Sequence, residues 1–593
     1  MTQFCRRYCL FLSTLCILSM AHFVRADQIF PASGWKPAPD PIASPDAIPG
    51  GALNVYSGPS PKSLNYYLEN SVTASMIFGH MYETLLTANS ISLEDEPGLA
   101  EKWAISEDKL TYTFWIDKKA KWSDGKPVTA HDVKYTFDMI MDPICLAGPQ
   151  KVYLGRFETC DVIDNHTVRF KAKNVHWSHL QSAGGFNILP RHAFPAEAEE
   201  FNKVNFEFNV VSGLYRLKTF RANEYLILEK RKDYWNAADP RLEGMYNFDQ
   251  LKLFFFAERD NAYEAFKKGD IDLFPVYTSH RWVNQTSGER FDKNHIVKQS
   301  IHNYDPIGFQ GFAMNMRKPP FDNVNVRKAM ALLLDRKTMN ATLMYNLYFL
   351  HKSYYEDLYT PENPCLNPLT PFDKEAARAL LKKAGWVANP ETGILEKNGK
   401  EFVVEFLTRS SSTDRFLAIY GEALKDVGIK LNPVKKDWAA WAKDMDEFNF
   451  MMTWAAWGAG VRKDPESMWL SSEAERPAGN NITGFKSEKV DALIEKQKNI
   501  FDLEERHEIV RQIDQLVFPE YPYALLWNLN FTRLLYWNKF GTPYTVLSKY
   551  GSENSALAYW WLDPDSDAAL GHARETGKPL PKLPEKIVFD EEF

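Results

Sequence analysis

Polar and apolar positions change period along the chain, from the alternation of strands to the three- or four-residue spacing of amphipathic helices. Residues 110–116 (LTYTFWI) and 402–407 (FVVEFL) predict strands. Residues 374–384 predict a helix with Asp373 as its N-cap and Gly385 as its stop. Strands and helices mixed irregularly over such a length are typical of an α/β fold whose sheets are covered by helices, in more than one lobe.

Two further stretches predict helices. Thr129 is the expected N-cap of the first, and Asp132 in its first turn favours the positive end of the helix dipole. Residues 487–517 predict long amphipathic helices. One face there carries Val490, Leu493, Ile494 and Gln497.

The first 26 residues have the pattern of a secretory signal peptide. A basic pair at 6–7 precedes an apolar stretch at 10–23, and Ala26 ends a cleavage site. Neither this stretch nor any later window reaches the roughly 18 apolar residues of a transmembrane helix. Cys16 follows the bulky Leu15 instead of the small residue that lipoprotein processing requires, so we expect a soluble protein free in the periplasm.

The length of 593 residues exceeds what one hydrophobic core usually supports and predicts two or three domains. A Pro-rich segment (27–50) and a polar tail (574–593) are expected to lie on the surface or to be mobile. The net charge of −7 becomes −10 when the leader takes three arginines away. Such an acidic balance does not suggest nucleic-acid binding.

Three cysteines remain in the mature chain: Cys145, Cys160 and Cys365. A disulfide between Cys145 and Cys160 would close a short loop, worth ~3 kcal/mol in the chain-entropy model. The alternative is that all three are small buried apolar residues.

The longest of several motifs covers residues 96–133, from EPGLAEKW through SEDKLTYTF to WSDGKPVTAHDV. This motif resembles those of the extracellular solute-binding proteins of peptide and nickel importers, family 5. Others follow in the family's order: GLYR (213–216), KDYW (232–235), FKKGDID (266–272), PFDNVNVRKAM (320–330) and LDR (334–336). The resemblance covers roughly residues 52–530 and is greatest to the YejA-type branch, associated with oligopeptides, cell-wall peptides and microcin C.

This resemblance implies a two-lobed periplasmic binding protein with discontinuous domains. Lobe I would combine residues 51–305 with 520–593 and carry an inserted subdomain at about 86–205. Lobe II would span 306–519. The chain would cross between the lobes twice, and the crossings would act as a hinge that closes on the ligand.

The implied function is that of the periplasmic substrate-binding component of an ABC importer. It would capture oligopeptides or peptide-like ligands, hand them to a membrane-embedded permease, act as a monomer, and need no cofactor or metal. Alternatives are a non-peptide cargo such as a nickel complex, haem or a sugar, or a periplasmic peptide hydrolase.

In peptide-binding relatives, a Trp-x-x-Asp segment of the second lobe pairs with the ligand's α-ammonium. The matching stretch here is Trp454, Ala455, Ala456, Trp457 and Gly458. Trp457 stands where the Asp is expected and offers an N–H and a π face but no anion. We expect Trp454 to form a wall of the binding site and Trp457 to stack on the ligand; alternatively, both pack in the core of the lobe.

Charge at this site would come from the loop that follows, through Arg462 or Asp464. The alternative for Asp464 is the start of a helix. Arg409 could meet a ligand carboxylate or be a solvated charge at a strand end. Asn315, near the expected lobe crossing, could shape the cleft or be a turn residue.

Enzymatic motifs are incomplete, and we expect no catalysis. His507-Glu508 begins a zincin-like pattern, but position 511 is Arg in place of the second His. Ser106 and Lys109 match Ser-x-x-Lys without the further motifs that such an active site needs.

Overall fold

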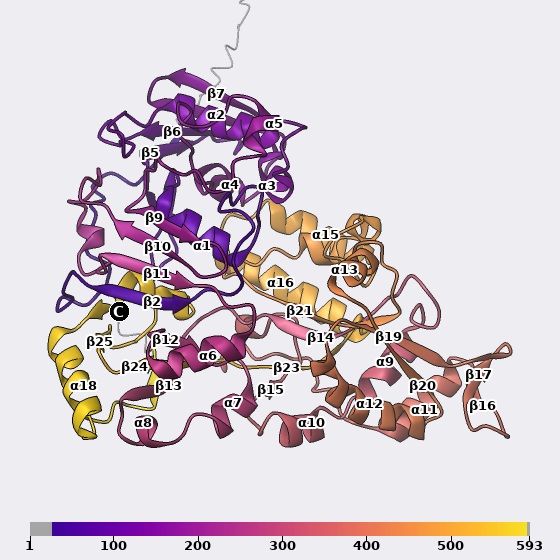
Figure 1. The fold of residues 1–593 in the computed structure, drawn as a ribbon. Helices are drawn as coiled ribbons and strands as arrows, with labels where there is room; N and C mark the ends of the chain where they lie inside the picture. Colours follow the sequence, from indigo (N-terminus) through magenta and orange to yellow (C-terminus); the bar gives the residue numbers. More distant parts are fainter. Residues whose placement is uncertain (1–26, 590–593) are drawn as a thin grey trace, which may run out of the picture.

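Three β-sheets organise residues 27–589, the part of the chain that the computed structural model describes (Figure 1). The expected signal peptide, residues 1–26, lies outside the described residues. Two of the sheets stand one above the other on the left of Figure 1, and the third lies to the right. The α/β prediction is confirmed.

The largest sheet has eight strands and draws them from distant parts of the chain. In order across the sheet they are β27 (Lys586–Val588), β13 (Ile296–His302), β24 (Thr532–Trp537), β12 (Leu273–Pro275), β2 (Ala52–Tyr56), β11 (Gln250–Phe254), β10 (Tyr225–Lys230) and β9 (Tyr215–Arg221). Because β24 lies between β12 and β13, the returning C-terminal chain is an inner part of this sheet. Helices α1 (Val72–Met81) and α6 (Arg259–Lys268) contribute buried side chains to its cores.

Four strands of the second sheet belong to a segment inserted between β2 and β9, and β1 (Gln28–Phe30) from the N-terminal segment adds to its edge. Its strands are β1, β5 (Ala100–Ile105), β6 (Thr111–Ile116), β8 (Thr167–Ala172) and β7 (Phe157–Asp164). Strand β6 confirms the strand predicted at 110–116, although Tyr112, Thr113 and Phe114 are all buried. Helix α2 (Ala130–Met141) begins after Thr129, whose backbone N–H donates to the Asp132 carboxylate at 2.8 Å. The predicted helix start is therefore confirmed.

The third sheet is sandwiched between two layers of helices. Its strands are β20 (Lys430–Lys435), β19 (Val403–Thr408), β21 (Met452–Trp457), β14 (Phe309–Met314) and β22 (Tyr523–Leu525). One face packs on α9 (Val324–Leu332), α11 (Lys374–Lys383) and α12 (Asp414–Asp426). The other packs on α15 (Glu488–Lys498) and α16 (Leu503–Val517).

These elements confirm several sequence predictions. Strand β19 and helix α11 fall where the patterns placed them, and the Asp373 side chain caps α11 by accepting from the N–H of Ala376. In α15, Val490, Ile494 and Gln497 are buried, as the amphipathic pattern predicts. Local periodicity was sufficient to predict these elements because each of them must turn an apolar face to the core.

The chain passes between the left-hand and right-hand parts at two places. Residues 303–308 join β13 to β14, and residues 529–531 join β23 (Trp527–Asn528) to β24. Both connections are short. They are the covalent links between the eight-stranded sheet and the third sheet, and they lie where a hinge would be.

Both ends of the described chain are attached to sheets. Strand β1 pairs with β5, and β27 pairs in parallel with β13. Residues 35–41 continue from β1 across the surface of the left-hand part. In the part of the chain that the structure describes, no helix is both long enough and apolar enough to cross a membrane.

In the described part of the chain Cys145 and Cys160 form no disulfide, which supports the alternative that the cysteines are small buried side chains. The structure has all three described cysteines as free, buried thiols. Cys160 lies on β7, Cys145 lies between α2 and α3 (Gly148–Leu154), and both belong to the apolar core of the inserted segment. Burial raises the pKa of the Cys160 thiol, so it acts as a small apolar side chain.

Candidate functional site

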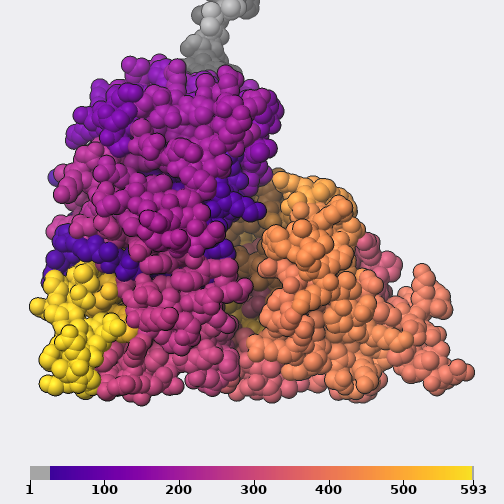
Figure 2. All heavy atoms as spheres, in the orientation of Figure 1, coloured from indigo at the N-terminus to yellow at the C-terminus, as the bar shows by residue number. Residues whose placement is uncertain are grey.

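A hollow separates the two sides of the molecule (Figure 2). It lies between the magenta surface of the left-hand part and the orange surface of the third-sheet lobe. The C-terminal end of β21 and the residues that follow it belong to this right-hand side. The stretch selected from the sequence, residues 454–464, is therefore the candidate site.

Trp454 and Trp457 point to opposite faces of the third sheet. Trp454 packs with Phe312 and Phe416, at ring distances of 5.5 and 5.2 Å, and its indole N–H donates to Gln310 Oε1 at 3.0 Å. Trp457 packs with the core on the α15–α16 face, and its indole N–H donates to the Tyr523 hydroxyl at 3.1 Å. Residues three apart on a strand must face opposite ways, so the structure does not bring the two indoles together.

The end of β21 exposes backbone on one edge. Strand β14 pairs with all of β21, but β19 pairs with it only at Met452 and Thr453. Among the described residues, no strand covers that edge of residues 454–457. Ala455 is buried between the layers, whereas Ala456 and Gly458 are exposed. Free N–H and C=O groups at such an edge can pair with an extended chain.

Arg409 packs on two tryptophan rings that were not among the residues predicted from the sequence. Its guanidinium lies 4.8 Å from the ring of Trp438 and 5.2 Å from that of Trp441. The two indoles stack at 5.4 Å, and Trp438 is 62% exposed. The two tryptophans lie at i and i+3 of helix α13 (Trp438–Asp446), and this spacing could have predicted the pair from the sequence.

Asn315 is completely buried directly after β14. Its side-chain amide donates to the carbonyl oxygens of Phe448 and Phe450, at 2.9 and 3.0 Å. These hydrogen bonds hold the end of β14 against the residues that lead into β21. Asn315 is therefore an internal side chain of this lobe.

Arg462 bonds to the inserted segment across the gap between the two sides. Its guanidinium donates to the carbonyl of Leu93 and lies 3.6 Å from an Asp95 carboxylate oxygen. Asp464 is exposed and accepts from the N–H of Glu466 at 3.1 Å, at the start of α14 (Glu466–Trp469). In this conformation the charge of Arg462 is already paired within the protein.

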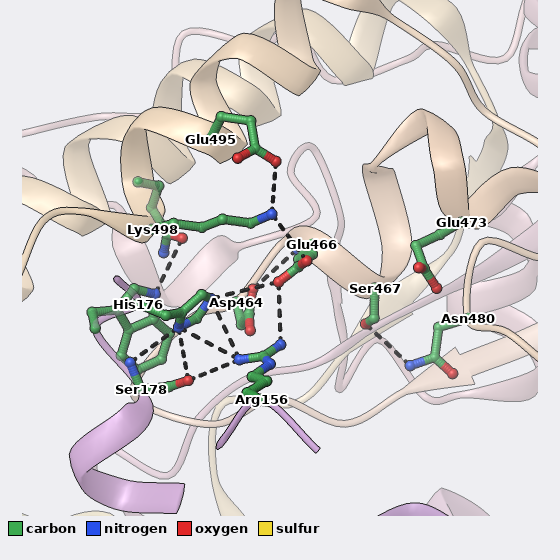
Figure 3. A network of polar contacts seen from close by, with 12 residues as sticks. Arg156, His176, Ser178, Asp464, Glu466, Ser467, Glu473, Asn480, Glu495 and Lys498 are labelled. Carbon is green, nitrogen blue, oxygen red and sulfur yellow. Dashed lines mark hydrogen bonds and ion pairs between the residues drawn. The ribbon is translucent and has the colours of Figure 1, made fainter. Parts of the chain in front are cut away.

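Glu466 is the centre of a polar cluster that joins the inserted segment to the third-sheet lobe (Figure 3). From the inserted segment, Arg156 Nη2 lies 3.2 Å and His176 Nε2 3.5 Å from Oε2 of Glu466. From α15, Lys498 Nζ lies 3.1 Å from Oε1. Burial alone would raise the pKa of Glu466, but His176, Lys498 and Arg156 lower it to about 2.

Trp177 extends this contact next to the Glu466 cluster. Its backbone N–H donates to the Lys498 carbonyl at 2.9 Å, and its indole N–H donates to Gln497 Oε1 at 3.2 Å. The guanidinium of Arg506 lies 4.2 Å from its ring. The segment 156–177 is thus held against α15 and α16 by ionic, neutral and cation–π contacts together.

His176, Asp464 and Glu466 also have the residue types of a metal site, with potential ligand atoms within 4.8 Å of one another. However, Arg156 and Lys498 already contact both oxygens of Glu466. A divalent cation there would meet two positive charges at close range. The cluster therefore fits an ion-pair network better than a metal centre.

The zincin-like pattern contributes no second metal ligand. His507 is buried, with Nε2 3.1 Å from the Val461 carbonyl oxygen. Arg511, at the position of the missing His, donates to Glu508 at 3.0 Å. Ser106 and Lys109 lie in the turn that precedes β6.

Three sheets, two chain crossings and an intervening hollow define the fold of a two-lobed periplasmic solute-binding protein. The oligopeptide-binding protein AppA from Bacillus subtilis, solved with a nonapeptide, matches with a TM-score of 0.70 at 22% identity. The match covers 87% of this chain and 100% of AppA.

The family model for bacterial extracellular solute-binding proteins, family 5, matches residues 94–477, and the chain belongs to that family. It is 27% identical to the uncharacterized protein y4wM of Sinorhizobium fredii, over 87% of this chain and 83% of the relative. It is 26% identical to the probable peptide-binding protein YejA of Agrobacterium fabrum, over 79% and 82%. The family and fold are those of binding proteins, not of enzymes.

Replacing Glu466 should loosen the contact between the lobes. In Glu466→Gln, the cations Arg156 and Lys498 lose their shared anion. We expect the free energy of unfolding to fall by about 2 kcal/mol. This decrease is smaller than for a fully buried pair because the Glu466 side chain is 22% exposed. Small-angle scattering should show a larger radius of gyration. Glu473→Gln, which removes a carboxylate paired with Arg476 inside one lobe, is the matched control; equal scattering from both variants would contradict the role of Glu466.

The stabilisation by Glu466 should also depend on pH. The pKa of this carboxyl is lowered from 4.5 to about 2, so its contribution is complete above pH 4.5 and is lost as the pH falls toward 2. Denaturant unfolding of the wild type and Glu466→Gln from pH 6 to 2.5 should therefore show a stability difference that shrinks below pH 4.5. A difference that grows on acidification would refute this assignment.

Proposed function

We propose that this chain captures oligopeptides or peptide-like ligands in the periplasm for an ABC importer. The observation that carries the proposal is the uncovered edge of β21, in the lobe that forms the right-hand side of the hollow (Figure 2), in a family 5 fold. Peptide backbone can add to such an edge as a further strand, and this recognition does not depend on side-chain identity. The probable peptide-binding relative and the AppA–nonapeptide complex point to the same class of ligand.

The residues after β21 suit this role. Ala456 and Gly458 are exposed and small, so a ligand backbone can approach closely. Trp457 is partly exposed at the strand end and is the proposed apolar contact for a ligand side chain. Trp457 stands where an Asp is expected to bind the ligand's α-ammonium. We infer that this ammonium is held elsewhere or by water.

Lobe closure would follow capture. The crossings at 303–308 and 529–531 allow rotation, and the Glu466 cluster holds the distant edges together once they meet. The closed monomer would then dock on its membrane permease. Export by the signal peptide expected at residues 1–26 would bring these steps outside the cytoplasmic membrane.

The cargo can be identified directly. Native mass spectrometry of the mature protein purified from its own periplasm, followed by denaturation and sequencing, should release an intact peptide or muropeptide of defined mass. Progressive cleavage of added peptides would instead support a hydrolase. An empty protein that shows no thermal shift with peptide pools would favour a non-peptide cargo such as a nickel complex, haem or a sugar.

Trp457→Ala should weaken binding of the released peptide about tenfold, because about 1.4 kcal/mol of aromatic contact is lost. Isothermal titration calorimetry measures the change. Trp115→Ala, which removes a partly exposed indole from β6 in the inserted sheet, is the matched control and should leave affinity unchanged. Unchanged affinity in Trp457→Ala would exclude the stacking role.

A further inference from the structure

A cavity of about 920 Å³ lies within the left-hand part of the molecule, separate from the hollow between the lobes. Its walls come from the Pro-rich segment near Trp35, the end of α1, the β3–β4 hairpin (residues 86–97), residues 234–246 and Tyr559. No residue of the third-sheet lobe lines it. This volume is large enough for a small organic molecule.

Glu83 places a buried carboxylate in this cavity. Tyr234 donates to Oε1 at 2.6 Å and Trp235 to Oε2 at 2.8 Å. Within residues 27–589 the structure gives this carboxylate no ion pair. Burial raises its pKa to about 7, and the two hydrogen bonds oppose that rise. The positive charge of Arg231 also opposes the rise, but Arg231 forms no ion pair with this carboxylate, which can still accept from a ligand cation.

His80, in the last turn of α1, adds a second acceptor to the lining. Its Nδ1 lies 2.8 Å from the Met76 carbonyl oxygen, and a carbonyl only accepts, so Nδ1 carries the proton. Burial lowers the pKa of His80 and favours the neutral ring. Its Nε2 is therefore an acceptor, and it is buried without a partner among the described residues. Buried polar atoms normally have a hydrogen-bond partner.

The remaining lining favours a cation with apolar and hydroxyl surface. Arg241 is already paired with Asp239 at 2.6 Å and with Glu96 at 3.3 Å. The other charged side chains of the lining are mainly acidic, including Asp40 and Glu94. Aromatic side chains also line the cavity: Trp35, Tyr82, Tyr215, Tyr234, Tyr246 and Tyr559. Such faces attract cations and suit sugar rings.

We propose that this cavity is a second binding site, for a small solute with a primary ammonium group, of the size and polarity of an amino sugar. The ammonium donates to Glu83 and to Nε2 of His80, which both line the cavity, His80 in the last turn of α1 and Glu83 just after the helix. No residue of the third-sheet lobe contributes to this lining, so the site is complete without the strand edge proposed for the peptide.

Calorimetry of the mature protein with D-glucosamine tests the proposal, with N-acetyl-D-glucosamine, which lacks the cation, as the ligand control. We expect saturable binding of glucosamine and at least tenfold weaker binding of the acetylated sugar. Glu83→Gln should weaken glucosamine binding at least tenfold. Equal affinity for the two sugars, or none for either, would overturn the proposal.

A second variant avoids disturbing the Glu83 hydrogen bonds. Gly79 lies on α1 at the cavity wall, and a Cβ there meets no atom within 4 Å. Gly79→Phe should fill the space and abolish glucosamine binding, whereas Gly571→Phe on α18 (Pro564–Thr576), equally unobstructed and outside the cavity, should not. Retained binding in Gly79→Phe would contradict the site.

The peptide site serves as the internal control. Gly79→Phe should bind the released peptide normally, and Trp457→Ala should bind glucosamine normally. Loss of peptide binding by Trp457→Ala alone would support the proposed function and say nothing against the cavity. Loss of glucosamine binding in Trp457→Ala would place the amine in the hollow instead and refute a second site.

Discussion

The lobes are joined covalently at two short crossings, so every other bond between them must be non-covalent. Glu466 is central to these because three basic groups meet its carboxylate, two of them from the opposite lobe. The Glu466 side chain is 22% exposed. It is shielded enough from solvent for its ion pairs to stabilise the contact, and accessible enough for these ion pairs to break when the lobes open. The shape of the hollow depends on this contact, since the crossings alone leave the far edges free to separate.

The third sheet accounts for both the rigidity and the accessibility of the proposed peptide site. Its two helical layers bury the side chains of β21 on opposite faces, which fixes the strand. Strand β19 pairs with only the first part of β21, which leaves an edge uncovered. Rigid backbone with one free edge gives a template for a ligand chain, and exposed small residues beyond it leave room for varied side chains.

The residues selected from the sequence had different outcomes. A strand alternates its side chains, so the separation of Trp454 from Trp457 could have been expected once 452–457 was recognised as a strand. Arg462 and Asp464 were chosen to contact a ligand, yet in this conformation they contact the protein itself. The stacked pair Trp438 and Trp441 was missed, although two tryptophans spaced i, i+3 on a polar helix were visible in the sequence.

The sequence by itself predicted several helices and two strands, because caps, periodicity and turn residues act over a few neighbouring positions. Its motifs indicated the family and, through that resemblance, the two-lobed architecture. Tertiary structure alone decided the ion-pair partners of Glu466, which lie up to 310 residues away along the chain. It also decided that the cysteines stay apart and that a Pro-rich segment closes a cavity over Glu83. Such contacts depend on how distant surfaces meet, and no local pattern records which polar side chain will be buried beside which other.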